Sequence, residues 1–587
     1  MPFEKTQLFY KNKFPRTHAV IVWSAVFLAA VTLVAVPGFR IEGALRDFIT
    51  VIQFVIAWLF VLENAANLVL HFNRKTYLAR NWPVVIVILG FAGLQIAGIE
   101  PHLVVKVFLF LSIILVFSRL LRNINAFARR PAVTLIGSYM LLILVGSVLL
   151  ALPGSSGDSG SLGLIDAMFT STSATCVTGL VVKDTFADFS PFGRLIILML
   201  IQVGGLGLMT FGAFFALAVG GGYGIRDRTM MTGLLETKGA GTVTRLIIFI
   251  LLFTFVFEAA GFFLLNGVWE KDGQLLGQTD QAYYSAFHSV SAFCNAGFTF
   301  FSDSFISLRD KFGIAIVVPL LIIVGGLGFA VCLNLLTMIG SRVSKFFGRG
   351  RQIFEDIEIA RPRMTVHTKL VLITTIILLF GSFVTIYLLE GNNPETLLSL
   401  EGWRKAEAVF FQAVTARTAG FNTVDTKKLT DASKFFLIIL MMIGASPGST
   451  GGGIKTVTLA ILAITLWSTI RGRPRVEVFK RTIPDVIVRR AFLIAVLGVF
   501  LTAVAALLLS VTERASGEPF LNLLFEATSA FGTVGLSAIN TWQLTDIGKV
   551  LIMILMLIGR IGPLTVVVAI IQKPGKTELP SERVMVG

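Results

Sequence analysis

The sequence predicts an all-α, polytopic membrane protein in which four pseudo-symmetric repeats, each a helix, a short pore helix and a second helix, surround one central pore. An N-terminal four-helix membrane bundle precedes the repeats. Three observations support this fold class. The 587 residues are 55% hydrophobic and only 14% charged, whereas about 25% of residues in soluble domains are charged. Apolar runs of about twenty residues recur along the chain. Four short polar segments between those runs are similar to one another.

The apolar runs predict helices, because they are continuous and lack the alternation of a membrane barrel strand. Each run carries few charges and has the length needed to cross a hydrocarbon core. We expect twelve spans, at residues 18–37, 49–71, 83–100, 102–121, 132–152, 193–219, 245–266, 312–340, 369–390, 434–470, 491–511 and 543–572.

Residues 1–131 hold the first four spans and form the expected N-terminal bundle. Glu63 lies in the middle of the second span, and the fourth span ends in SRLLRNINAFARR. A working voltage sensor carries an arginine at every third residue through the membrane. Only Arg119 and Arg122 keep that interval, and they lie at the helix end. The segment predicts a degenerate sensor-like or purely structural bundle, and an active voltage sensor is the less favoured alternative.

The net charge of +16 does not indicate binding to nucleic acid, since the basic residues do not gather on one soluble segment with interleaved aromatics. They concentrate in alternate connections, most of all in 341–369 and 471–490. By the positive-inside rule this distribution predicts a multi-pass protein, surrounded by membrane lipid, with both termini in the cytoplasm. The basic N-terminus leads into a full-length span without a cleavage site, so we expect no removed signal peptide and a plasma (inner) membrane location.

Four segments share an amphipathic stretch, a small polar turn, a glycine and an apolar residue. They are FTSTSATCVTGLVVKDT, FHSVSAFCNAGFTFFSD, FQAVTARTAGFNTVDT and FEATSAFGTVGLSAINT. Their shared glycines recur at intervals of about 120 residues. Each segment is too short and too polar to cross a membrane, and irregular backbone at membrane depth is tolerated only where it is buried in protein or lines water. The four turns are therefore expected to converge on a pore.

This periodicity divides the chain into pore repeats at 132–240, 241–365, 366–485 and 486–572, followed by a cytoplasmic tail at 573–587. The sequence VGGLG occurs at 203–207 and again at 324–328, in the second helix of the first two repeats. Small residues allow close helix packing in membranes, which explains both copies.

The three residues ending in each shared glycine, here called the four turns, are the predicted ion-binding residues of a selectivity filter. They are Val177, Thr178, Gly179, Asn295, Ala296, Gly297, Thr418, Ala419, Gly420, Thr533, Val534 and Gly535. The last triplet, T-V-G, is typical of potassium-channel filters, where backbone carbonyls replace the hydration shell of the ion. Glycine permits the backbone to turn its carbonyls inward, and the preceding short helices would point their negative ends at a potassium ion. Close helix packing would explain one copy, but four copies favour a filter.

The sequence GASPGSTGGGIKT, residues 444–456 and here called the glycine loop, has two interpretations. A phosphate-binding loop needs its lysine at a fixed offset from the glycines, and here Ile454 stands between Gly453 and Lys455. Apolar runs flank the loop, whereas a phosphate loop joins a strand to a helix in a soluble domain. Pro447 and the glycines instead predict that a membrane helix unwinds here. A nucleotide-binding membrane protein is the less favoured alternative.

The remaining residues do not predict catalysis or a cofactor bound by this chain. The five histidines show no metal-ligand spacing, and Asp, Ser and His residues are dispersed over different loops. Three cysteines cannot make a disulfide framework. We expect a transporter rather than an enzyme.

The four turns, the glycine loop, GRIGPLT at 559–565 and the C-terminal SERVMVG together resemble the Trk/Ktr/HKT superfamily, and within it the KtrB-type (TrkH-like) potassium-translocating subunits. The resemblance covers residues 132–587. It implies potassium uptake through a gated, channel-like pore, a homodimer, and a cytoplasmic ring of RCK-type (KtrA/TrkA-like) nucleotide-binding regulatory subunits. Sodium-selective plant relatives carry serine where this chain has the first glycine, which favours potassium. A sodium-permeable or sodium-coupled transporter, or sodium as an activator, stays open.

The resemblance also implies a gate in the glycine loop and the last repeat. The implied gate residues are Gly444, Ser446, Pro447, Gly448, Ser449, Thr450, Gly451, Gly452, Gly453, Lys455 and Arg560. Arg560 would form an electrostatic barrier beside the loop, since a charge within a membrane span should face the pore or a partner. The alternative is a structural arginine bonded to helix-end carbonyls. Lys455 would be a second barrier or a side chain that reaches the cytoplasmic side.

Overall fold

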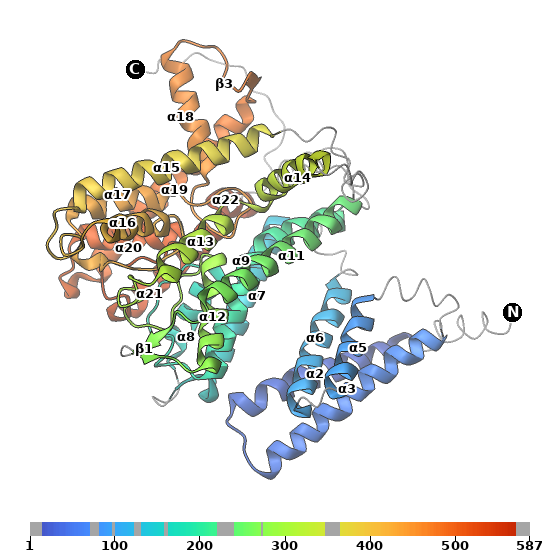
Figure 1. Ribbon diagram of the computed structural model, residues 1–587. Helices are drawn as coiled ribbons and strands as arrows, with labels where there is room; N and C mark the ends of the chain where they lie inside the picture. The colour runs from blue at the N-terminus through green and yellow to red at the C-terminus, as the bar shows by residue number, and fades with distance from the viewer. Residues whose placement is uncertain are drawn as a thin grey trace. The chain divides into compact units, whose positions relative to one another are not determined.

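The computed structural model describes residues 15–70, 82–96, 100–121, 131–157, 162–219, 240–271, 274–346 and 364–570, and these form a predominantly helical structure (Figure 1). The chain packs as two compact units. Unit 1 comprises Met1–Ala128, Val145–Ala167 and Phe186–Ile196, and unit 2 comprises Arg129–Leu144, Met168–Thr185 and Ile197–Gly587.

Four helices form the N-terminal bundle of unit 1. They are α2 (Pro15–Gly38), α3 (Ala44–Leu70), α5 (Trp82–Ile96) and α6 (Pro101–Leu121). Ala29, Ala57 and Leu109 are fully buried in the core of this bundle. The buried amide of Gln53 donates to the carbonyl of Thr32 at 3.1 Å and so links α3 to α2. The bundle is therefore held by apolar packing together with a polar contact between helices.

The predicted basic end of the fourth span is only partly described. Arg119 lies in the last turn of α6, whereas Arg122, Arg129 and Arg130 lie outside the described residues. The choice between a sensor-like and a structural bundle therefore stays a prediction.

The four repeats present the same order of elements, a long helix, a short pore helix and a second helix. The first has α7 (Pro131–Leu150), η2 (Pro153–Ser155), α8 (Leu164–Cys176) and α9 (Pro191–Val219). The second has α11 (Ala240–Leu265), the antiparallel pair β1 (Glu270–Lys271) and β2 (Gln274–Leu275), α12 (Gln278–Phe293), η3 (Gly313–Val317), α13 (Val318–Gly326) and α14 (Phe329–Phe346).

The last two repeats follow the same plan. The third has α15 (Val366–Glu390), α16 (Trp403–Thr415), η4 (Thr426–Lys428), α17 (Asp431–Met442), α18 (Thr456–Ile470) and the antiparallel pair β3 (Glu477–Val478) and β4 (Arg481–Thr482). The fourth has α19 (Asp485–Thr512), η5 (Arg514–Ser516), α20 (Phe520–Gly532), η6 (Thr541–Gln543), α21 (Asp546–Ile561) and α22 (Pro563–Ile570). The short helices α8, α12, α16 and α20 are called the pore helices below.

Each expected span coincides with a helix or a pair of helices, but several are interrupted. By length and composition, five of the helices in the described ranges could cross a membrane, or six if one bent pair counts as one span. The expected span at 312–340 is a bent pair of helices, because the chain turns by 100° between α13 and α14, where Gly328 has φ +90°. The span at 543–572 likewise breaks at Gly562, with φ +95°. Glycines with positive φ end a helix, which hydropathy does not reveal.

The two VGGLG sequences combine close packing with this helix break. A Cβ on Gly204 or Gly325 would lie 2.0 Å from the carbonyl oxygen of Thr175 or Phe293, at the end of a pore helix. Close packing is therefore confirmed in both copies. In the second copy, packing alone was an incomplete explanation, since the same sequence also ends α13 and forms the bend.

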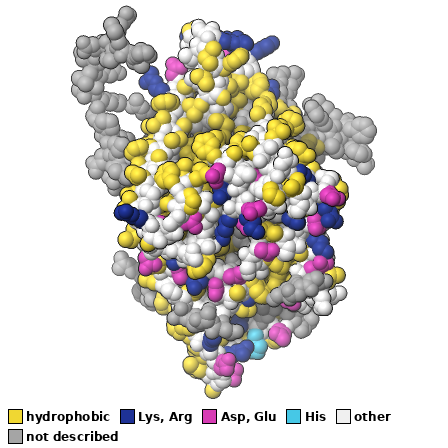
Figure 2. All heavy atoms as spheres, turned by 90° about the vertical axis from the view of Figure 1, so that its left-hand side faces the viewer, with side chains coloured by type: hydrophobic (Ala, Val, Ile, Leu, Met, Phe, Trp, Pro, Cys, Tyr) yellow, Lys and Arg dark blue, Asp and Glu magenta, His cyan; other side chains and the backbone are white. Residues whose placement is uncertain are grey.

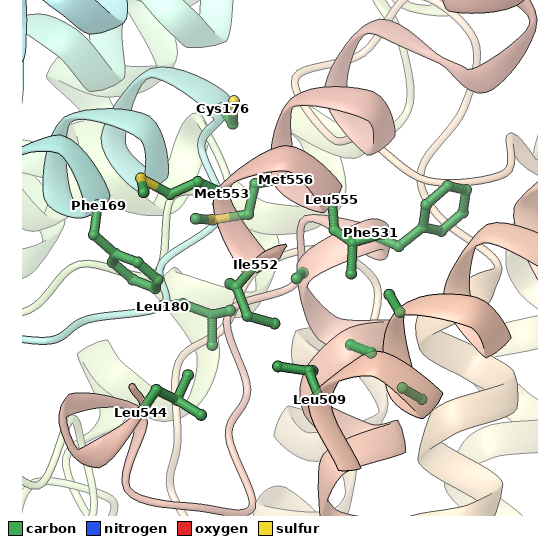
Figure 3. Close-up of a cluster of buried hydrophobic side chains, with 14 of the residues drawn as sticks. Phe169, Cys176, Leu180, Leu509, Phe531, Leu544, Ile552, Met553, Leu555 and Met556 are labelled. Carbon is green, nitrogen blue, oxygen red and sulfur yellow. The ribbon is translucent and has the colours of Figure 1, made fainter. Parts of the chain in front are cut away.

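The fourth pore helix lies at the centre of unit 2. It packs against α17, α19 and α21, and its buried residue Phe531 belongs to a core shared with the first repeat. Figure 3 shows Phe169 and Leu180 of the first repeat facing Ile552 and Met553 of α21. The first and last repeats therefore meet, as a ring of four requires.

Two buried glutamates tie the long helix of a repeat to its second helix. Glu513 follows α19 and accepts hydrogen bonds from Thr545, the N-cap of α21, through its hydroxyl at 2.6 Å and its N–H at 3.1 Å. Glu390 at the end of α15 accepts in the same way from the hydroxyl of Thr430, the N-cap of α17, at 3.0 Å. A carboxylate beside a helix N-terminus is stabilised by the helix dipole.

Large apolar side chains are exposed on the outer helices. Phe380 and Leu388 of α15 and Val511 of α19 are 70%, 74% and 69% exposed. On the face seen in Figure 2, hydrophobic side chains cover a broad area bordered by charged ones. An apolar surface of this extent suits contact with lipid rather than water.

We predict that Glu513→Gln lowers the free energy of unfolding by about 1–3 kcal/mol, because a neutral amide is a weaker acceptor for the groups of Thr545. Thermal unfolding of the purified protein in detergent micelles measures the change. Glu401→Gln, at an exposed position, is the matched control. Equal unfolding temperatures for the two variants would contradict the capping role.

Candidate functional site

Each of the four turns begins one to three residues after the end of a pore helix, and the four turns have similar backbone conformations. The first residues of the turns have positive φ, at 56° for Val177, 60° for Asn295, 77° for Thr418 and 50° for Thr533. The glycines also have positive φ, at 89° for Gly179, 72° for Gly297, 81° for Gly420 and 94° for Gly535. A left-handed conformation is strained for valine and threonine. Because the same strain recurs in all four turns, we infer that the fold requires this backbone position in each of them.

The turns close into a ring, here called the glycine ring. A Cβ on each glycine would lie 2.2–2.7 Å from the carbonyl oxygen of the middle residue of the next turn. The pairs are Gly179 with Ala296, Gly297 with Ala419, Gly420 with Val534 and Gly535 with Thr178. The order runs through the repeats and returns to the first. This arrangement agrees with the prediction from the sequence that the four turns converge.

The glycine ring is held by hydroxyl residues of the pore helices, which sequence reasoning missed. The N–H groups of Gly179 and Gly535 donate to Ser173 Oγ and Ser529 Oγ, at 3.1 Å each. In the other two repeats the hydroxyl donates instead, from Ser291 to Phe298 at 2.8 Å and from Thr415 to Phe421 at 2.7 Å. All four hydroxyl residues stand within the aligned repeat sequences, so the alignment contained the signal.

The third repeat is one residue shorter between this hydroxyl and the glycine. Ser173, Ser291 and Ser529 precede their glycines by six residues, whereas Thr415 precedes Gly420 by five. The backbone adjusts, because Ala419 N–H bonds to the carbonyl four residues back at 3.0 Å, while the middle residues of the other turns bond five residues back. The four turns thus share a conformation, but the third turn stands one residue closer to its hydroxyl residue.

The glycine loop interrupts the second helix of the third repeat, between Met442 and Thr456, as Pro447 and the glycines predict. A parallel bridge pairs Ile443 with Ile454, and Gly444 N–H donates to the Ile454 carbonyl at 2.8 Å. The loop also bonds to the bend of the second repeat. Ser446 N–H donates to the Gly326 carbonyl at 3.1 Å, and the Gly448 carbonyl accepts from Phe329 N–H at 2.9 Å.

The tip of the glycine loop lies against the glycine ring. A Cβ on Gly451 would be 2.2 Å from Thr418 Oγ1, and one on Gly452 would be 2.3 Å from Thr533 Oγ1. Gly452 N–H donates to that same Thr533 hydroxyl at 3.0 Å. Two of the four turns are therefore covered by backbone, and only glycine allows so close an approach.

The two predicted cations of the gate both bond to the glycine loop. Arg560 is 1% exposed and donates to the carbonyls of Thr450 in the loop and of Gly204 in the first repeat, the latter at 2.5 Å. Lys455 Nζ donates to the carbonyl of Gly451 at 2.6 Å. Arg560 thus connects the loop to α9, and the ammonium of Lys455 is engaged with the loop itself.

The arrangement suits a cation and not a phosphate. The glycine ring offers backbone carbonyls and the negative ends of four helices, which favour a dehydrated cation. N–H groups of the glycine loop instead donate to carbonyls of the loop, to neighbouring backbone or to the Thr533 hydroxyl, and its lysine bonds to carbonyls of the loop. A phosphate cradle needs free N–H groups and a free lysine.

Comparison with known proteins places the chain among cation transporters. The family model described as TrkH, cation transport protein, matches residues 104–579. The chain is 37% identical over 451 residues to the Ktr system potassium uptake protein B of Vibrio alginolyticus, covering 77% of this chain and 93% of that protein. It is 36% identical over 464 residues to the potassium/sodium uptake protein NtpJ of Enterococcus hirae, covering 78% and 97%.

A solved structure shows the same fold. The potassium transporter TrkH from Vibrio parahaemolyticus aligns with a TM-score of 0.55 at 17% sequence identity, covering 90% of this chain and 99% of that one. At this identity the likeness concerns the fold alone.

We predict that Gly535→Ala destabilises the protein by about 1–3 kcal/mol, because a methyl group at positive φ would also collide with the Thr178 carbonyl. Gly381→Ala in α15 is the matched control, since nothing lies within 4 Å of its Cβ position. Thermal unfolding in detergent compares the two. Equal stability of the two variants would show that the ring is not tightly closed.

Proposed function

The chain belongs to the TrkH family of cation transport proteins, and on that basis we propose that it is a potassium uptake transporter whose ions pass through the glycine ring. The observation that carries this proposal is the closed order of four glycines and four carbonyls. Two relatives that align over more than nine-tenths of their own length are named potassium uptake proteins. Ion movement down an electrochemical gradient needs no catalytic chemistry, and no enzymatic activity is proposed.

Carbonyl oxygens are the chemistry that potassium binding needs. Potassium sheds its hydration shell at modest cost when backbone oxygens of similar field replace the water. The predicted filter residues supply these oxygens without a carboxylate in any turn. Inside-negative membrane potential would supply about 2.3 kcal/mol per charge per 100 mV for uptake.

A sodium-permeable or sodium-coupled transporter is the second candidate. One relative of 36% identity is named a potassium/sodium uptake protein. The glycine in the first turn favours potassium, because sodium-selective plant relatives in the superfamily that this chain resembles carry serine at this position. Sodium as an activator of this chain is an equally open proposal.

The glycine loop is proposed as the gate. Its tip approaches Thr418 and Thr533 at the glycine ring, so ions could pass only if the loop withdrew. Arg560 supports this role, since its guanidinium holds the loop carbonyl of Thr450 and places a positive charge near the path. The residues proposed to move are those of 444–456.

A cytoplasmic RCK-type ring and a homodimer are proposed as the assembly. Relatives named as parts of a Ktr system support the existence of further subunits. We propose that the protein lies in the plasma membrane with both termini in the cytoplasm. The docking surface would then include 341–369 and 471–490. Of these, 347–363 lie outside the described residues, as does the tail at 573–587, while β3 and β4 form an exposed hairpin within 471–490.

The direct test is cation uptake by the purified protein in liposomes held at an inside-negative potential. We expect potassium to enter several-fold faster than sodium, because the carbonyl ring selects the larger ion. Protein-free liposomes and the variant Gly381→Ala are the controls. Equal rates for the two ions would favour the sodium-permeable alternative, and no uptake of either ion, with or without a cytoplasmic partner, would contradict transport.

Removing the charge of Arg560 tests the gate. We expect Arg560→Ala to raise potassium flux several-fold or to change its voltage dependence, because the loop loses its hydrogen bond and the path loses a positive charge. Arg514→Ala, at an exposed arginine after α19, is the control. Unaltered current in Arg560→Ala at equal expression would remove the barrier role, and Arg560→Lys separates loss of charge from loss of shape.

A further inference from the structure

The four pore helices share a buried polar position that the filter prediction did not use. In each helix a fully buried phenylalanine, at 169, 287, 411 or 525, is followed by one polar residue. These polar residues are Thr170, His288, Gln412 and Glu526, which are 3%, 0%, 2% and 0% exposed. They stand eight or nine residues before the turn glycines. The charged residue of the four is Glu526.

Glu526 binds the chain segment that follows the fourth turn. Its carboxylate accepts hydrogen bonds from Ser537 Oγ and from Thr541 Oγ1, at 2.7 Å each. Ser537 is two residues beyond Gly535, so the carboxylate reaches the chain directly after the glycine ring. The pore helix thus holds the last residue of the turn, Gly535, through Ser529 and holds Ser537, just beyond the turn, through Glu526.

The second repeat uses the same position in a weaker form. His288 Nε2 accepts a hydrogen bond from Phe300 N–H at 3.2 Å, three residues beyond Gly297. In the third repeat the side-chain amide atoms of Gln412 have no hydrogen-bond partner among the described residues. Hydrogen bonds to an ionised group are about twice as strong as those between neutral groups. The strongest of these ties is therefore in the fourth repeat.

Ser537 also connects the fourth repeat to the third. Its carbonyl accepts a hydrogen bond from Thr426 Oγ1, and Lys427 Nζ binds the side-chain oxygen of Asn540. The carboxylate of Glu526 therefore anchors the segment after the fourth turn, which is bonded to both the third and the fourth repeats. A shift of that segment would move Val534 relative to Gly420 and Gly535 relative to Thr178, the two contacts that the fourth turn makes in the glycine ring.

The placement of Glu526 is costly, which argues for a specific role. An ionised carboxylate is almost never fully buried unless it is paired, and here its partners are two hydroxyls. The pKa of Glu526 is raised to about 7, chiefly because burial disfavours the charged form; the hydroxyls of Ser537 and Thr541 oppose this rise, Glu518 adds to it and Lys427 opposes it. The elements packed against α20 also carry buried Lys434 on α17 and Lys549 on α21, and Glu513 follows α19.

We propose that Glu526 is a positioning residue for ion selectivity, whose carboxylate acts through Ser537 and Thr541 to hold the carbonyls of the fourth turn at the spacing that discriminates potassium from sodium. This inference rests on the proposed function of the glycine ring. It assigns part of the discrimination between potassium and sodium to the carboxylate of Glu526, which is not itself an ion ligand.

The test compares potassium and sodium uptake by reconstituted protein carrying Glu526→Gln. The amide of glutamine has one oxygen, so it cannot accept from both hydroxyls as the two carboxylate oxygens do. We expect the ratio of potassium uptake to sodium uptake to fall about tenfold, which corresponds to the loss of one hydrogen bond to a charged group. Adding Ser537→Ala to Glu526→Gln should cause little further loss, because both changes break the same tie. Glu401→Gln, an exposed glutamate, is the control.

The pH profile distinguishes positioning from mere stability. Below its pKa the carboxyl group is protonated and becomes a donor, so it loses part of its capacity to accept. Wild-type selectivity should therefore fall as the solution on the side of these loops is acidified from pH 8 to pH 5, while Glu526→Gln should show a flat profile. A glutamate that only stabilised the fold would not give a selectivity change tied to its own titration.

Two results would overturn the proposal. One is a Glu526→Gln protein with the wild-type ion ratio and the wild-type pH profile. If that variant does not fold, the pair Ser537→Ala and Thr541→Val replaces it, and wild-type selectivity in that pair is the second overturning result. Failure of the proposed function looks different, because the unmodified protein would then show no preference for potassium at any pH.

Discussion

The rest of unit 2 depends on the close approach of four glycines to four carbonyl oxygens. Each glycine leaves no room for a Cβ beside the carbonyl of the next turn, so the four pore helices must end at nearly the same distance from one axis. The hydroxyls of the pore helices hold the turns in a left-handed conformation that valine and threonine would not adopt by themselves. The long helices, the buried glutamates that cap the second helices and the apolar core between the first and fourth repeats keep that distance.

The same constraint explains the glycine loop. A continuous second helix in the third repeat would bring side chains to the place where Gly451 and Gly452 now lie against Thr418 and Thr533. The loop replaces a helical ladder by hydrogen bonds to the bend at Gly328, to Thr533 and to Arg560. These partners come from the second and the fourth repeats, on either side of the third repeat in the order of the ring. Displacement of the loop would therefore alter contacts with both of these repeats at once, which is a physical basis for coupling between the loop and the ring.

Sequence reasoning recovered the fold class because hydropathy, repeat spacing and glycine positions are local properties of the chain. It found the turns and the interrupted helix at Pro447 for the same reason. It missed the bend at Gly328 because VGGLG in the first repeat stays helical, and only tertiary contact with Pro447 and Gly448 separates the two copies. It also missed Ser173, Ser529 and Glu526, whose partners lie six to fifteen residues away and become visible only when the turn is folded.

The shorter interval between Thr415 and Gly420 in the third repeat has a consequence for how such a ring can vary. A tetramer of identical subunits changes all four quarters whenever one codon changes. A single chain with four unequal repeats can delete a residue before Gly420, place a histidine in one pore helix and a glutamate in another, and leave the other quarters as they are. The sequence of each quarter of this ring can therefore change separately, so that one repeat can accommodate the glycine loop while its neighbour carries the buried glutamate.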